Sequence, residues 1–489
     1  MQQDERLRLQ VFDCRKVINM VDQQVAKIVA SEEYREKYGF SSNVEYEEFH
    51  KGIDEETVRK ISKIKSEPEW MLEKRLTAFR IFLQKPTPKW GADLSSINYD
   101  DIYYYRQPKG KEANKWDDVP SDIKKTFEKL GVPEAEAKFF AGAEAQFDSS
   151  VVYSHVNKEL ERQGIIFTDT DTAVKKYPEL MKKYFGTIIP PTDNKFAALN
   201  TAVWSGGSFI YIPKGVKASM PLNAYFRINA EKSGQFERTL IIADEGSEVQ
   251  YIEGCTAPVY ASNSLHSAIV ELVALKGAKI RYVTIQNWSK NVFNLVTQRA
   301  HVEEDGRVEW IDANIGSKVN MKYPSIYLKG RNASGEVLSI ALAGEGQIQD
   351  SGGKIYHLAP NTTSKIISKS VSKGSGVSTF RGMLHIGKNA ENAKAHVSCD
   401  ALLLDGFAKT NTYPYNQIQR SDAIVSHEAK IGKISDDEIF YLMSRGISEE
   451  DAVAMIVLGF IDDLTKVLPM EYSLELKRLI KLDTSGGVG

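Results

Sequence analysis

The sequence predicts a mainly β fold built on a parallel β-helix, and two observations indicate it. First, short alternating segments recur along the middle of the chain about once every 29 residues. A period of about 20 to 50 residues held over several copies is typical of a solenoid. Second, each copy alternates apolar and polar residues and is bounded by glycine turns, which indicates strands. The apolar residues that mark the period are Val249, Ile280, Val308, Val337, Ile366 and Ala395.

The chain divides by pattern into three regions. Residues 1–150 are charged and mostly helical in rhythm, as in Val11 to Ala30 and Glu55 to Phe82, and predict an N-terminal helical domain. Residues 151–432 follow the β pattern after a helical stretch at Thr172 to Tyr184. We therefore expect the β-helix core to occupy this second region.

Residues 433–489 return to a helical period and predict a C-terminal helical domain. Ser435 and Ser448 each precede an acidic residue at the third helical position, which is typical of a helix N-terminus. The helix after Ser448 is apolar on nearly all sides from Ala452 onward. Such a helix has to be buried in its own domain or against another protein.

Composition limits the function classes. The 489 residues include 63 Lys plus Arg and 65 Asp plus Glu, a net charge of −2 that offers no electrostatic case for nucleic acid. Apolar runs stay shorter than a membrane span, and the N-terminus lacks the pattern of a signal peptide. Three cysteines favour a reducing, cytoplasmic location over a disulfide framework. A phosphate-binding glycine loop of the ATPase type is absent, which excludes a stand-alone ATPase.

Two cysteines fall inside the repeat. Alternate residues of a strand share a face, so Tyr251, Glu253 and Cys255 point the same way, and Cys399 points to the equivalent side of a later turn. The cysteines are about five turns apart, or roughly 24 Å at the usual strand spacing. A disulfide between them is therefore excluded.

Glu428 follows Cys399 by one full period, which predicts that it lies one turn on and about 5 Å from the thiol. His427 would then face the opposite way, unless the end of the solenoid is bulged. Thiol, carboxylate and imidazole are the groups that hold iron or zinc. The simpler interpretation is that Cys399 is a small core residue and that His427 and Glu428 are solvated. Cys14, on a helical face, is expected to be plain core.

Four stretches of the chain closely resemble one family, the SufB-type scaffold subunits of the SUF iron–sulfur cluster assembly machinery. The resemblance runs from about residue 20 to the C-terminus. It implies a right-handed parallel β-helix with helical flanks, and a scaffold that is not itself an enzyme. The stretches are Tyr251 to Pro258, Gln286 to Trp288, Ser426 to Ala429 and Phe440 to Gly459.

The resemblance also implies roles for residues. Cys255 matches the cysteine that accepts persulfide sulfur from a SufE- or SufU-type carrier working with the desulfurase SufS. Cys399 matches the cluster-assembly cysteine, and His427 and Glu428 match the family's His-Glu pair. The cluster would be transient, of [4Fe–4S] or [2Fe–2S] type, in a complex that can hold reduced flavin.

Partners are implied as well. The β-helix would pair with SufD or with a second SufB, and the C-terminal helices around Ser448, Ala452 and Ile456 would bind the ATPase SufC.

Four further residues resemble the family's tunnel residues, through which sulfur would pass between the cysteines. Gln286 and Trp288 share a face with the inward positions of their strand, and Arg227 and Asn229 share a face with each other, one turn before Cys255. Many relatives carry a lysine where this chain has Gln298, which weakens the case for a tunnel cation there.

Two other classes stay open at this point. A polysaccharide-active β-helix enzyme would need charged residues in an outer groove and usually a secretory signal. A purely structural solenoid would tolerate loss of both cysteines, which a growth test under iron limitation would reveal.

Overall fold

The computed structural model describes residues 36–42, 44–109, 119–130, 142–156, 158–468 and 470–484. The predicted helix from Val11 to Ala30, with Cys14, lies outside these ranges. Residues Ser41–Ile434 form one compact unit, and the described residues outside this range form a second. The division into residues 1–150, 151–432 and 433–489 stays a prediction.

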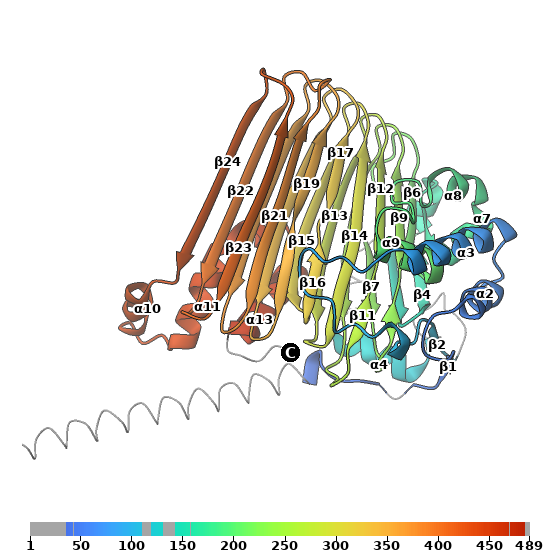
Figure 1. Ribbon diagram of the computed structural model, residues 1–489, viewed down its shortest axis with the longest axis horizontal. Coiled ribbons are helices and arrows are strands. Elements are labelled where there is room, and N and C mark those ends of the chain that lie inside the picture. The colour runs from blue at the N-terminus through green and yellow to red at the C-terminus, as the bar shows by residue number, and fades with distance from the viewer. Residues whose placement is uncertain are drawn as a thin grey trace, which may run out of the picture. The chain divides into compact units, whose positions relative to one another are not determined.

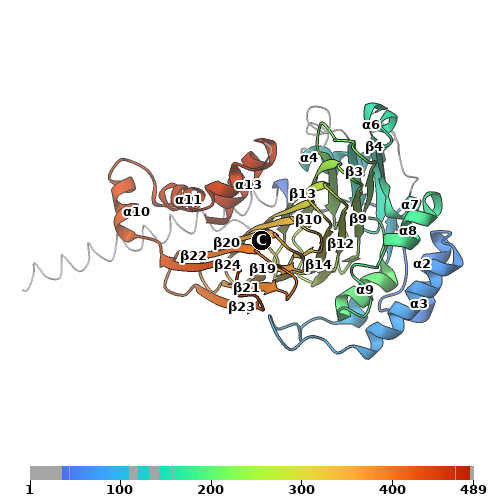
Figure 2. The same cartoon turned by 90° about the horizontal axis from the view of Figure 1, so that it is seen from above.

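The predicted parallel β-helix is confirmed, with about eight turns. The turns contribute strands to both of two sheets, because the chain alternates between the sheets as it advances (Figure 1). Neighbouring strands are parallel except for one antiparallel pair near the start of each sheet. Figure 2 shows the sheets as two facing walls, with β20, β22 and β24 in one and β19, β21 and β23 in the other. In spatial order, the ten-stranded sheet consists of β24 (Ile424–Lys433), β22 (Lys394–Leu403), β20 (Thr363–Ser372), β18 (Ser334–Ala343), β15 (Arg307–Gly316), β13 (Lys279–Trp288), β10 (Glu248–Thr256), β7 (Leu222–Arg227), β3 (Gly142–Phe147) and β4 (Ser150–Val156).

The second sheet has twelve strands. Its main path is β23 (Lys409–Ile418), β21 (Val377–Ile386), β19 (Ile348–His357), β16 (Val319–Lys322), β14 (Val292–Val302), β12 (Ile269–Ala274), β9 (Arg238–Ala243), β6 (Ser208–Ile212) and β5 (Ile166–Asp169). Three short strands lie off this path: β8 (Gly234–Gln235), β11 (Ser264–His266) and β17 (Ser325–Leu328).

The length of a turn is not constant. Arg307 pairs with Ser334, and Thr363 pairs with Lys394. The period had predicted Glu336 and Asn392 as these partners, so the first step is two residues short and the second is two residues long. A shift of two residues keeps the same side chains on the same face of a strand, and the two shifts have opposite signs. Every strand from β10 to β22 therefore still presents the predicted face to the interior.

The interior of the solenoid is apolar at one end of each strand and polar at the other. The rings of Tyr251, Tyr282 and Trp310 contact one another in successive turns in a tilted arrangement, with centroids 5.2 and 4.9 Å apart. All three are fully buried. Such aromatic contacts between adjacent strands stabilise the register of the turns.

Helices cover the first turns within the larger unit (Figure 1). The helix α3 (Glu69–Gln84) packs on α9 (Lys195–Val203). It carries Arg75, which forms a buried ion pair with Glu67 and donates to the carbonyl oxygens of Ala202 and Trp204. The remaining elements here are β1 (Tyr46–Glu48), α2 (Glu55–Ile64), η1 (Tyr99–Asp101), β2 (Arg106–Pro108), α4 (Ser121–Leu130), α6 (Lys158–Arg162), α7 (Thr170–Lys176) and α8 (Pro178–Tyr184).

The smaller unit contains α10 (Asp436–Met443), α11 (Glu449–Phe460), α12 (Asp462–Thr465) and α13 (Met470–Thr484). Both predicted helix starts are confirmed, because Ser435 accepts from the Glu438 amide and Ser448 from the Asp451 amide. Ala452 is buried on α11, which packs against α13. Among the described residues, no helix combines the length and apolar character that crossing a membrane requires.

Candidate functional site

Both repeat cysteines lie inside the β-helix. Cys255 is 0% exposed on β10, and Cys399 is 2% exposed on β22. Both belong to the buried core cluster between the sheets. Five strand steps separate them, through β13, β15, β18 and β20, which at about 4.8 Å a step gives the roughly 24 Å that the repeat predicts.

A column of polar side chains connects the two turns. Glu253, which faces inward beside Cys255, is in register with Thr284, and the column continues turn by turn until it reaches Cys399. Every member is buried. In order, the column is Glu253, Thr284, Asp312, Ser339, Ser368 and Cys399.

The opposite sheet supplies polar partners to this interior. Asn294 on β14 donates to Gln286 at 2.5 Å, and Lys322 on β16 donates to Asp312 at 2.9 Å. Both members of the Lys322–Asp312 pair are buried. Within the described part of the chain, the Oδ1 atom of Asn314 and the Oε1 atom of Gln349 are buried without a hydrogen-bond partner. Unpaired polar atoms are rare in a packed core, so this side of the interior differs from an ordinary apolar core.

The Cys255 thiol faces a carboxylate. Its Sγ atom lies 3.6 Å from Oε1 of Glu253, whose other oxygen accepts from the Tyr282 hydroxyl at 2.5 Å. Burial, with Glu237 nearby, raises the pKa of Glu253 to about 7. Burial and Glu253 raise the pKa of the Cys255 thiol well above its ordinary value. The resting thiol is therefore protonated and shielded from solvent.

The Cys399 thiol has a different setting. Its Sγ atom lies 3.7 Å from the hydroxyl of Thr412 on the facing strand β23. Burial raises the pKa of this thiol too, although the Thr412 contact opposes the shift. Only one further turn, β23 with β24, separates Cys399 from the open end of the solenoid.

The predicted placement of Glu428 beside Cys399 is wrong. The last step is one residue longer than the period, so Cys399 pairs with Ala429, and Glu428 pairs with Ser398. A one-residue slip reverses the faces of a strand. Glu428 therefore points outward, 3.9 Å from His396, and His427 shares the inner face of Cys399.

His427 is positioned by the facing strand, since its Nδ1 atom lies 3.1 Å from the side-chain nitrogen of Asn416. Burial lowers the pKa of His427, so its imidazole stays neutral and suited to metal at neutral pH. Across the described ranges, no three His, Cys, Asp or Glu side chains converge to hold a metal ion.

The four residues predicted to line a tunnel divide into two pairs. Gln286 lies beside Cys255 in register, and Trp288 is fully buried with its ring 4.6 Å from His266. Arg227, by contrast, is in register with Thr256 and donates to its hydroxyl at 3.0 Å, on the opposite face from Cys255. The geometry thus supports an interior position for the first pair and does not for Arg227.

Asn229 follows Arg227 and belongs to a structural contact. Its side chain accepts from the Ser42 amide at 2.9 Å and donates to the Tyr46 hydroxyl, and its backbone amide donates to Asp148. This network fastens the segment around β1 to the β-helix.

Sequence reasoning assigned no role to two charged residues of the interior. Glu253 is two residues from Cys255 in the same strand, so the sequence already predicted that both side chains lie on one face and close together. Lys322 lies on the short strand β16, outside the aligned repeats, so the period carried no signal for it. Gln298 is buried, and Lys322 supplies a cation to the same interior.

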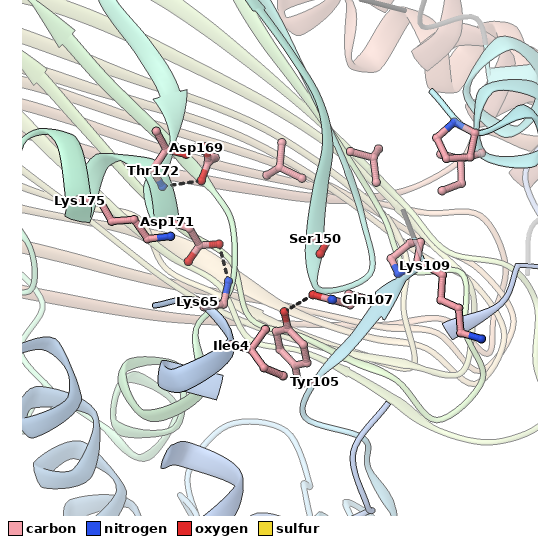
Figure 3. Close-up of a pocket in the computed structure, with 15 residues that line it drawn as sticks. Ile64, Lys65, Tyr105, Gln107, Lys109, Ser150, Asp169, Asp171, Thr172 and Lys175 are labelled. Atoms are coloured by element: carbon pink, nitrogen blue, oxygen red, sulfur yellow. Dashed lines mark hydrogen bonds and ion pairs between the residues drawn. The ribbon is translucent and has the colours of Figure 1, made fainter. Parts of the chain in front are cut away.

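A separate cavity of about 250 Å³ lies between the N-terminal elements (Figure 3). Lys65 pairs there with Asp171, and Asp169 accepts from the Thr172 amide at the start of α7. As far as the described residues go, neither cysteine lines it. These contacts hold the helices in place, and the cavity lies apart from the polar column.

The open end of the β-helix exposes apolar side chains. Among the described strands, the outermost ones, β23 and β24, each pair on one edge only. Tyr413, Tyr415, Ile424 and Ile431 on these strands are about half exposed or more. Proteins usually protect such edges, so an uncovered apolar edge is typical of an interface.

Comparison with known proteins agrees with this geometry. Residues 226–460 match the family model described as "SUF system FeS cluster assembly, SufBD core domain", and residues 56–224 match "SufBD protein N-terminal region". An iron–sulfur cluster assembly SufBD family protein of Staphylococcus haemolyticus is 56% identical over 454 residues, which cover 93% of this chain and 98% of the relative. A relative of the same description from Staphylococcus aureus is 55% identical over the same coverage. The chain therefore belongs to the SufBD family of iron–sulfur cluster assembly proteins.

Proposed function

We propose that this chain is a SufB-type scaffold, which accepts sulfur at Cys255 and builds an iron–sulfur cluster at Cys399. One observation supports the proposal most directly. Both thiols face the same interior, five strands apart, and a continuous column of polar side chains joins them. A purely structural solenoid has no need for a polar column between two thiols, whereas a sulfur route does.

The two thiols suit different steps. Cys255 lies beside a carboxylate and would take sulfur from a carrier persulfide delivered by a cysteine desulfurase. Its burial requires the surrounding turns to open for the carrier, or the sulfur to arrive through the interior. Lys322, the buried cation of the column, would stabilise an anionic sulfur species on its way to Cys399.

The cluster site is incomplete in a single chain. Cys399 and His427 share the inner face near the open end and would supply a thiolate and an imidazole. Glu428 would join them only if the last turn shifted by one residue. Iron–sulfur clusters are usually held by four protein ligands, so the remaining ligands would come from a second chain. A small ligand set from each partner favours release of the finished [4Fe–4S] or [2Fe–2S] cluster, and reduced flavin would supply electrons.

The exposed surfaces fit the implied partners. The apolar end at β23 and β24 would pair with SufD or with a second copy of the chain. The helices around Ser448, Ala452 and Ile456 would receive the ATPase SufC, and Phe440 and Met455 are exposed there. ATP hydrolysis would reside in SufC, so the chain itself would be a scaffold and no enzyme. The few cysteines fit a cytoplasmic location.

The test is anaerobic cluster assembly with partners co-purified, measured as iron and sulfide per complex and as visible absorbance. We expect Cys399→Ala to abolish the cluster while the fold persists. Cys255→Ala should block assembly from desulfurase sulfur but permit it from added sulfide. Cys14→Ala is the matched control and should behave as wild type. Normal assembly by the Cys399→Ala complex would refute the proposal and favour a structural solenoid.

A further inference from the structure

The contact between Glu253 and Cys255 concerns two groups that solvent does not reach. Both residues lie on β10, two positions apart on the same face, and they are 3% and 0% exposed. The Oε1 atom of Glu253 lies 3.6 Å from Sγ. A thiol must lose its proton to act as a nucleophile, and Oε1 of Glu253 is an acceptor within reach of Sγ.

Tyr282 orients the carboxylate. Its hydroxyl donates to Oε2 of Glu253 at 2.5 Å, from the adjacent strand β13. This contact occupies one oxygen and leaves Oε1 directed at the thiol. Tyr282 is therefore a positioning residue for Glu253.

Other charged groups face the same space from several elements. Glu237 and His266 form a buried ion pair on the facing sheet, and Lys322 on β16 pairs with Asp312. Glu237 raises the pKa of Glu253, whereas Lys322 and His266 lower it. The result, about 7, lets the carboxylate exchange protons at neutral pH.

We propose that Glu253 is the general base of sulfur acceptance, with Oε1 taking the proton from Sγ of Cys255. The proposal rests on Cys255 being the sulfur acceptor. As the proton moves, Sγ attacks the terminal sulfur of a persulfide or polysulfide donor. The donor's S–S bond breaks, its departing sulfur keeps the electron pair, and a new S–S bond forms at Cys255. Sulfur passes between thiols without net oxidation, so no oxidant is needed.

The test measures persulfide formation on Cys255 in the full-length chain, with inorganic polysulfide as the donor, from about pH 6 to about pH 9. Mass spectrometry of the alkylated Cys255 peptide reports the rate. We expect the wild-type rate to rise through about pH 7 as Glu253 loses its proton. Glu253→Gln should slow the reaction by about 10²-fold at the upper end of that rise and remove the step at about pH 7.

Neighbouring variants should move the step in opposite directions. Tyr282→Phe removes a hydrogen bond that favours the carboxylate, so the step shifts to higher pH. Glu237→Gln is the matched control, because it neutralises another buried carboxylate that does not touch the thiol. It should keep the step and shift it to lower pH. Glu253→Asp, which keeps the charge, should retain a slower, pH-dependent reaction.

Different outcomes test the role of Glu253 as general base and the role of Cys255 as sulfur acceptor. Coincident pH profiles for wild type and Glu253→Gln would overturn the role of Glu253 while leaving Cys255 as acceptor. A Cys255→Ser complex that assembles clusters from desulfurase sulfur at the wild-type rate would overturn the proposed function itself. Circular dichroism of each variant checks the fold, and a folded Glu253→Asp chain without any pH step also counts against the base.

Discussion

We expect the loss of the Glu271 carboxylate to destabilise one defined part of the larger unit, the contact between a sheet and a loop. Glu271 lies on β12 and is fully buried. It pairs with Arg238 at 2.9 Å and accepts from three backbone amides that follow α8. One carboxylate thus joins the sheet to the loop that leads into α9.

The contacts of Glu271 allow the effect of Glu271→Ala to be estimated. Removing one partner of a buried ion pair costs about 3 to 5 kcal/mol of unfolding free energy. Each amide that loses its acceptor costs about 1 to 3 kcal/mol more. The four contacts share one carboxylate, and water entering the vacated space recovers part of the loss. We therefore expect a total of about 4 to 6 kcal/mol.

Two assays check this expectation. Denaturant unfolding of the full chain reports the free energy, and hydrogen exchange reports the amides of Gly186, Ile188 and Ile189 individually. Glu271→Ala should lose protection at these amides before the β-helix opens. Glu245→Ala, which breaks an exposed pair with Lys214, is the control and should change neither measurement. A Glu271→Ala chain that keeps these amides protected and loses under about 1 kcal/mol would refute the reasoning.

Three further predictions concern other parts of the same unit. Burial lowers the pKa of His357 to about 4, so between about pH 6.5 and pH 4 only the unfolded chain binds a proton at this residue. The free energy of unfolding should therefore fall by about 3 kcal/mol as the pH drops through this range. Unfolding of His357→Gln at a series of pH values should lack this loss, and a loss equal to that of the wild type would contradict the prediction. Lys322→Met leaves the Asp312 charge buried without its partner and should lower the free energy of unfolding by about 3 to 5 kcal/mol. Adding Asp312→Asn in a double-mutant cycle should restore most of this loss, and strictly additive effects of the two substitutions would argue against the ion pair. Tyr413→Asp on the edge strand β23 should leave the melting temperature unchanged but weaken association with a SufD-type partner in size-exclusion chromatography, and undisturbed association would place the interface elsewhere.

Much of the candidate site could be predicted because strand parity is a local property. Glu253 and Cys255 are two residues apart, so their shared face needs no knowledge of neighbouring turns. The separation of Cys255 from Cys399 was also predictable. The step from Arg307 is two residues short of the predicted period and the step from Thr363 is two residues long, so the errors cancelled.

Other placements depended on where individual turns begin and end. Arg227 is in register with Thr256 instead of Cys255, a pairing set by the loop between β7 and β10. Lys322 reaches Asp312 across the interior, from a strand of the other sheet. Neither pairing has a signature in the local sequence, because the contacts join strands through loops of variable length.

The amino-acid sequence alone determined the solenoid, the inward face of both cysteines and the five turns between them, since a periodic alternation of apolar residues can be buried in only one way. The tertiary structure decided which of His427 and Glu428 faces Cys399, because a final step one residue longer than the period exchanges the two faces of β24. It also decided what lines the interior between the thiols, since those contacts form between sheets. A repeat predicts the spacing of turns, but only the hydrogen-bonded register selects the side chains that meet.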